Sequence, residues 1–168
     1  METAYHPDPI FNPVHPEVQK AVIAFIRDFA GRYAGFTAFK GISLNLWAPT
    51  IGWFGSLRTG YDDCTCRLFE NETGIRIPVD ARDPHRFSKR YKFLCFACRP
   101  AWIAWRCRKV RDLMCRLRDT LVAVRPDLRL TLTAWVEPYV PQFLGNGGAQ
   151  HQIGARKSTV ELCREAGF

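Results

Sequence analysis

The sequence has no run of about twenty apolar residues, so it offers no segment that could form a membrane-spanning helix. Its first residues contain neither a basic stretch nor an apolar core, and the pattern of a signal peptide is therefore missing. Phosphate-binding motifs are missing too, because the glycine-rich residues 145–148 are not followed by Lys and Ser or Thr. We expect a cytoplasmic protein with no membrane partner and no cofactor.

A disulfide framework is not expected either. The seven cysteines are an odd number, and they lie mainly in segments with helical patterns. The pairs Cys64/Cys66 and Cys95/Cys98 have the close spacing of zinc ligands, but their surroundings are apolar and lack the turn glycines of a zinc knuckle. We interpret these cysteines as small buried thiols and predict no metal site.

Two segments alternate small or polar residues with aliphatic ones, and each ends in tryptophan: residues 41–47 and 130–135. The chain between them is too long for a hairpin, so we predict parallel strands joined by a right-handed helical crossover. Periodicity and capping residues predict helices from Pro16 to near Tyr33, from Asp62 or Asp63 to Gly74, from Asp83 to an interruption at Pro100, over about 101–124, and over 157–166.

This order of elements predicts an α/β fold, a partial (β/α) TIM-barrel fragment with parallel strands and long crossover helices. Two strands cannot close a barrel, and a complete barrel needs about 250 residues. With 168 residues, of which 47% are apolar, the chain has room for a single domain over 1–168, with residues 1–14 as an irregular lead-in. We expect either self-association or a missing barrel portion, and a truncated reading frame that cannot fold stably stays open as an alternative.

Positive charge is concentrated in one part of the chain. The formal net charge is +8, and many of the basic residues lie between Lys89 and Arg118 at helical spacing among apolar ones. We interpret them as the solvated outer face of an amphipathic helix. The alternative is a basic nucleic-acid-binding module formed by the same helices, which we do not favour.

Five short motifs follow one another in an order found in a known family. They are Asn-Pro-x-His-Pro-x-Val at 12–18, Phe-x-Gly at 39–41, Tyr-Asp-Asp-x-Thr at 61–65, Phe-Glu-x-x-Thr-Gly at 69–74 and Trp-x-x-Trp-Arg at 102–106. In this pattern, which extends to about residue 135, the sequence resembles the family-ten-type glycosyl hydrolases, glycoside-hydrolase-like barrel proteins. The motif residues themselves have the character of helix caps and packing residues rather than of catalysts.

The resemblance implies a (β/α)8 barrel, of which this chain would hold the middle, and hydrolysis of O-glycosyl bonds by two carboxylates. In the related barrel clan the acid is a glutamate that follows an asparagine, whereas here Asn45 is followed by Leu46. We therefore expect no activity from the chain in isolation. The candidate catalytic carboxylates are Glu137, which follows the second strand, and Asp62.

A carbohydrate ligand is the partner that we expect. Aromatic rings stack on sugar faces, and an amide can bond to sugar hydroxyls. Burial in the core is an equally good interpretation of each aromatic residue, and Asn45 could instead bond to neighbouring backbone groups. The candidate substrate-binding residues are Asn45, Trp47, Tyr61 and Trp135.

Overall fold

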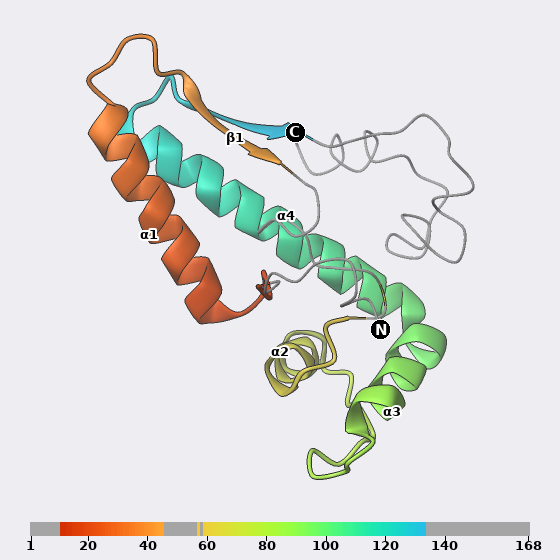
Figure 1. The fold of residues 1–168 in the computed structure, drawn as a ribbon. Coiled ribbons are helices and arrows are strands. Elements are labelled where there is room, and N and C mark those ends of the chain that lie inside the picture. Colours follow the sequence, from red (N-terminus) through yellow and green to blue (C-terminus); the bar gives the residue numbers. More distant parts are fainter. Residues whose placement is uncertain (1–10, 46–56, 58, 134–168) are drawn as a thin grey trace, which may run out of the picture. The chain divides into compact units, whose positions relative to one another are not determined.

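The computed structural model describes residues 11–45, 57 and 59–133, and the chain divides into two compact units (Figure 1). Unit 1 consists of Met1–Phe54 and Lys109–Trp135, and unit 2 of Gly55–Arg108 and Val136–Phe168. The single domain over 1–168 stays a prediction. The expected helix at 157–166 lies outside the described residues.

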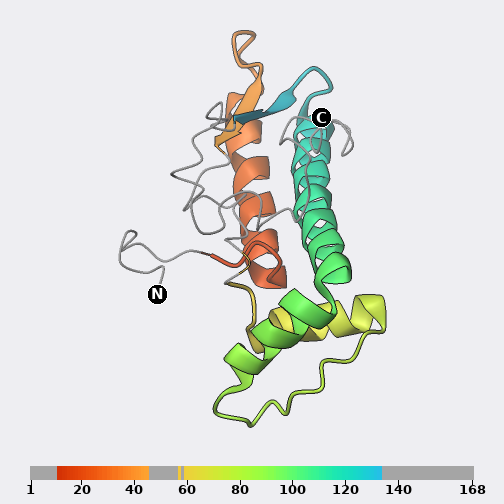
Figure 2. The ribbon, with the colours of Figure 1, turned by 90° about the vertical axis from the view of Figure 1, so that its right-hand side faces the viewer.

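Unit 1 contains α1 (Pro16–Tyr33), β1 (Gly41–Asn45), the second part of α4 (Arg99–Val124) and β2 (Arg129–Thr133). The two strands are parallel, with Gly41 opposite Arg129 and Asn45 opposite Thr133. Figures 1 and 2 show α1 and the second part of α4 side by side next to the strand pair. The predicted α/β character and the parallel pairing are therefore confirmed, as a two-stranded sheet within the described residues.

Local signals explain the bounds of α1. Pro16 occupies the first turn, where its missing N–H costs no intrahelical hydrogen bond, and His15 Nδ1 accepts a hydrogen bond from the backbone N–H of Glu17 at 3.3 Å. Ile26 and Ala30 are buried on the inner face. Gln19, also buried, accepts a 2.6 Å hydrogen bond from the guanidinium of Arg116 on α4. The predicted helix from Pro16 to Tyr33 is confirmed.

Arg125, which follows α4 directly, connects the chain before β1 with the chain before β2. Its guanidinium donates to the backbone carbonyls of Ala34, Phe36 and Phe39, in the turn between α1 and β1. It also pairs with Asp127 at 2.6 Å, just before β2. Because one side chain holds the chain before β1 and the chain before β2, the two strands begin at a fixed offset.

Unit 2 contains α2 (Asp63–Thr73), α3 (Arg86–Lys92), the π-helical segment η1 (Phe93–Ala97) and the first part of α4. Asp62 caps α2, and Gly74 ends it in the left-handed conformation with φ +73°, as predicted. The helical chain is interrupted at Cys98, so Pro100 lies in the first turn of α4 and restarts the helix. No helix of the described ranges combines the length and the low polarity that a bilayer crossing requires.

The core of unit 2 is aromatic. The rings of Trp102 and Trp105 stack at 5.3 Å between centroids, and Phe69 meets both rings edge-on at 5.2 and 5.6 Å. All three residues are at most 1% exposed. Burial of three large aromatic side chains stabilises the packing of α2 on α4 by several kcal/mol, at about 25 cal/mol per Å² of buried apolar area.

Gly41 provides a test of the strand pairing. A Cβ atom at this position would lie 1.9 Å from the carbonyl oxygen of Arg129, and its φ is +141°. We expect Gly41→Ala to lower the free energy of unfolding by about 2–4 kcal/mol, because the strands must move apart. The control is Gly31→Ala in α1, where an added Cβ meets nothing within 4 Å and should stabilise by up to about 1 kcal/mol. Equal stability of the two variants in denaturant titrations would contradict the described pairing.

Candidate functional site

The carboxyl ends of β1 and β2 lie next to each other, because the strands are parallel and in register. One face of the pair is exposed and polar, and we call four of its residues the polar face: Ser43, Asn45, Thr131 and Thr133. The opposite face is partly buried and aliphatic, with Ile42, Leu44, Leu130 and Leu132. The candidate ligand-contact residue Asn45 is thus placed at the strand ends and exposed.

A hydrogen bond joins the two strands across the polar face. Ser43 Oγ lies 2.8 Å from Thr133 Oγ1, and either hydroxyl can be the donor. Thr133 is also the register partner of Asn45, so the last described rung of the sheet carries an amide beside a hydroxyl. Side chains of this kind donate and accept hydrogen bonds without carrying charge.

Three of the predicted site residues lie outside the described residues: Trp47, Trp135 and Glu137. Their roles in stacking and catalysis stay predictions. In the sequence, Trp47 comes two residues after Asn45 and Trp135 two residues after Thr133, so the two tryptophans follow the paired strands at equivalent positions.

Asp62, the second candidate carboxylate, is the N-cap of α2. Its Oδ1 accepts from the backbone N–H of Thr65 at 2.9 Å, and its Oδ2 accepts from the hydroxyl of Thr65 at 2.7 Å. Thr65 is fully buried and Asp62 is partly exposed. Both carboxylate oxygens therefore have a structural partner, and the predicted capping role is confirmed.

Tyr61 is 6% exposed and packs against Tyr91 and Trp102, with ring centroids at 5.6 and 5.9 Å. Its hydroxyl donates to the carbonyl of Leu57 and lies 2.9 Å from Cys95 Sγ. Burial, reinforced by the adjacent thiol, raises the pKa of the phenol. Of the two interpretations of this residue, these contacts favour burial in the core over sugar stacking.

Two buried arginines bind the chain on either side of Gly60. Arg106 is 4% exposed and donates to the carbonyl of Thr59 at 2.8 Å, while Arg90, 5% exposed, donates to the carbonyl of Tyr61 at 2.9 Å. Burial lowers the pKa of Arg106 to about 10. Arg90 also bonds to Asp63 at 2.7 Å and holds the pKa of that carboxyl below its ordinary value.

We interpreted the basic residues between Lys89 and Arg118 as the solvated face of an amphipathic helix. That interpretation is wrong for Arg90 and Arg106, because both are buried. It does hold for other basic residues of the segment, which are exposed and pair with nearby carboxylates: Lys89 with Asp83, Arg108 with Glu72, Arg111 with Asp112 and Arg118 with Asp119. The sequence does contain a signal for the burial of Arg106. Arg106 comes four residues after Trp102 and directly after Trp105, on the apolar side of the predicted helix.

The cysteines that the structure describes in unit 2 are free thiols, and Cys66 and Cys95 are buried, as predicted. Burial raises the pKa of Cys66 to about 12. Cys95 lies within the π-helical segment, in the apolar surroundings that the sequence indicates. Over residues 11–45, 57 and 59–133, no group of three or more His, Cys, Asp or Glu side chains is placed to hold a metal ion.

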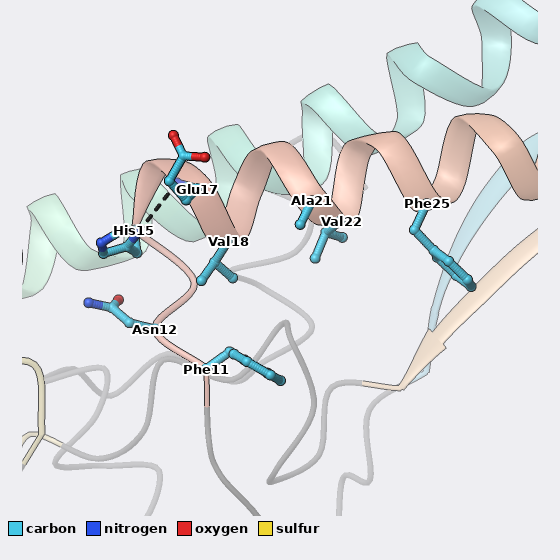
Figure 3. A pocket seen from close by; sticks show the side chains of 8 residues that line it. All are labelled: Phe11, Asn12, His15, Glu17, Val18, Ala21, Val22 and Phe25. Carbon is cyan, nitrogen blue, oxygen red and sulfur yellow. Dashed lines mark hydrogen bonds between the residues drawn. The ribbon is translucent and has the colours of Figure 1, made fainter.

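A groove of about 550 Å³ runs along α1 (Figure 3). Its lining is mostly apolar and consists of Phe11, Asn12, His15, Glu17, Val18, Ala21, Val22 and Phe25. His15 is already engaged as the helix cap, and Phe11 and Phe25 are 60% and 64% exposed. The groove contains none of the predicted site residues and offers an apolar surface rather than a reactive one.

Comparison with known proteins gives one match. Residues 2–138 match the model of a protein family described as glycosyl hydrolase-like 10. The matched range contains both strands and all the described helices. No curated protein and no solved structure matches the chain.

The buried Arg106 leads to a stability prediction. Arg106→Met keeps an unbranched apolar side chain but removes the guanidinium, which leaves the carbonyl of Thr59 without this donor and should lower the free energy of unfolding by about 2–4 kcal/mol. The matched control is Arg108→Met two residues later, where a 44% exposed side chain pairs with Glu72 at 3.6 Å. There we expect a change of at most about 1 kcal/mol. Denaturant titrations that give equal losses would refute the role assigned to Arg106.

The raised pKa of Cys66 predicts a pH dependence. In the unfolded chain this thiol ionises near pH 9, but in the folded protein only near pH 12. Above pH 9 the unfolded state therefore binds fewer protons, and stability is lost as the pH rises from 9 towards 12. Between pH 9 and about pH 10.5 the wild type should lose roughly 2 kcal/mol more than Cys66→Ala. Identical pH profiles of the two proteins would show that Cys66 is not the titrating group.

Proposed function

This chain belongs to the glycosyl hydrolase-like 10 family, and we propose that it binds carbohydrate at the carboxyl ends of β1 and β2. The resemblance drawn from the sequence motifs is thereby confirmed, and the chain is glycoside-hydrolase-like. The observation that carries the proposal is the exposed, polar and uncharged edge at Asn45 and Thr133, where two parallel strands end together. In βα folds, ligands bind at this end of the strands.

The barrel forms part of the same proposal. The two strands and the helical crossover between them are one βαβ unit, the building block of a (β/α)8 barrel. In the proposed barrel, β1 and β2 are neighbouring strands, and the other strands are supplied outside the described residues. A single parallel pair leaves backbone groups at its edges that other strands can pair with, so the proposal includes either self-association or completion by a further barrel portion.

Tryptophans complete the proposed binding edge. Trp47 and Trp135 follow β1 and β2 at the same distance in the sequence, and we include both indoles in the proposed binding edge. An indole contributes a broad apolar face for a sugar ring, while Asn45 contributes directional hydrogen bonds to hydroxyls. We do not include Tyr61, because its ring is buried in unit 2.

Hydrolysis needs two carboxylates, one of them to protonate the leaving oxygen and the other to act as nucleophile or base. Asp62 is a poor candidate for either role, because Thr65 occupies both of its oxygens. We therefore assign the acid role to Glu137, with the second carboxylate supplied from outside this chain. Without that second group the chain binds sugar and does not cleave it.

The binding part of the proposal can be tested at the tryptophans. The protein has five tryptophans, whose indole N–H signals can be followed by NMR during titration with cellopentaose, maltopentaose and xylopentaose. We expect the signals of Trp47 and Trp135, assigned through their Phe variants, to shift with at least one of the sugars. The buried Trp102 and Trp105 serve as internal controls and should not shift. If none of the three sugars shifts Trp47 or Trp135 at millimolar concentration, the proposed binding edge is wrong.

Catalysis is tested separately with a panel of aryl glycosides. We expect no turnover by the isolated chain, because the carboxylate pair is incomplete. If turnover is found and Glu137→Gln abolishes it, the acid role of Glu137 is supported and the expected inactivity is wrong. Turnover that survives Glu137→Gln would remove this residue from the mechanism.

A further inference from the structure

The polar face of the sheet is unusual for parallel strands. Parallel sheets are covered on both faces, so their strands are normally apolar throughout. Inside a βα barrel, the inward positions are dominated by bulky branched aliphatic residues. Here four successive positions of one face are Ser43, Asn45, Thr131 and Thr133, and all four are exposed. This composition requires an explanation that apolar packing does not provide.

Covering this face with an apolar layer would be costly. Each hydroxyl or amide buried without a partner costs about 1–3 kcal/mol in proteins, and the face presents three hydroxyls and one amide. The bond between Ser43 and Thr133 satisfies only one donor and one acceptor of that set. The remaining groups need partners that donate and accept hydrogen bonds, which an aliphatic layer cannot supply.

The arrangement of the four residues is compact. Ser43 lies opposite Thr131 and Asn45 opposite Thr133, so the residues occupy two rungs on the same side of the sheet. The 2.8 Å hydrogen bond runs diagonally between these rungs and holds the two hydroxyl oxygens together. A preorganised set of hydroxyl and amide groups loses little side-chain entropy when it binds a polar ligand.

We propose that Ser43, Thr131 and Thr133 form, together with Asn45, a contact surface for the hydroxyl groups of a neutral sugar. This inference rests on the proposed function. It adds neutral sugars as the ligand class and Ser43, Thr131 and Thr133 as further contact residues. Sugar hydroxyls both donate and accept, as do the side chains of the polar face. Each pair of opposite residues is one strand spacing apart, about 5 Å, which is the scale of one sugar ring.

The four residues of the polar face are uncharged, and this indicates the class of sugar that they bind. None of the four side chains can neutralise a uronic acid or an amino sugar. The nearest charge on this face among the described residues is Arg129, at the other end of β2. It lies two residues before Thr131 and four before Thr133, about 7 and 13 Å along the strand. A carboxylate bound beside Asn45 and Thr133 would therefore be desolvated without a charged partner next to it, so the strand ends favour neutral sugars over acidic ones.

The test removes the hydroxyls and keeps the strand. Ser43→Ala combined with Thr133→Val deletes the fixed pair, and valine suits a strand position. The matched control is Thr37→Val, which removes an exposed hydroxyl from the turn before β1. Titrations with cellopentaose, maltopentaose and xylopentaose should show roughly tenfold weaker binding for the double variant and no change for the control. Thr131→Val leaves the Ser43–Thr133 bond in place and provides a second measurement if the double variant does not fold.

The outcomes separate this inference from the function on which it rests. Sugar binding that is unchanged in both the double variant and Thr131→Val overturns the contact surface and leaves the proposed carbohydrate binding intact. Tighter binding of oligogalacturonate than of the neutral sugars overturns the ligand class. If no oligosaccharide binds to the wild type, both the contact surface and the proposed function are overturned.

Discussion

The guanidinium of Arg125 is the group on which the arrangement of unit 1 depends. Its planar fork carries five N–H donors, enough to bind the carbonyls of Ala34, Phe36 and Phe39 and the carboxylate of Asp127 together. The turn before β1 is thus attached to the residues that lead into β2. Since Gly41 then allows the strand backbones to meet, the parallel pair begins in one register, and that register places Asn45 beside Thr133.

Unit 2 uses arginine in the same way. Arg106 and Arg90 bind the carbonyls of Thr59 and Tyr61, so these two side chains hold residues 59–61 in place within unit 2. Three arginines that contribute to the net charge of +8 are therefore engaged with the protein's own backbone. Because guanidinium groups that bind backbone carbonyls are less available to phosphate groups, the net charge overstates the attraction for nucleic acid.

Elements with local signals could be predicted from the sequence. Pro16, the Asp62 cap and Gly74 mark helix ends through their own backbone preferences, and the long connection between the strands implied parallel pairing. The anchors could not be predicted in this way, because Arg106 and its carbonyl partner are 47 residues apart. Asp62 had been assigned both a capping and a catalytic role, and only its contacts with Thr65 distinguish them. The π-helical turn at Phe93–Ala97 depends on packing, for which periodicity provides no signal.

Binding a sugar and cleaving it require different side chains at this sheet. Binding a neutral sugar needs donors and acceptors at strand spacing, which Ser43, Asn45, Thr131 and Thr133 provide without charge. Cleavage needs two carboxylates facing one bond, and the first described carboxylate after β1, Asp62, is fixed by its cap contacts. Because the two sets of residues do not overlap, the proposed sugar contacts of the polar face do not depend on the carboxylates that cleavage would need.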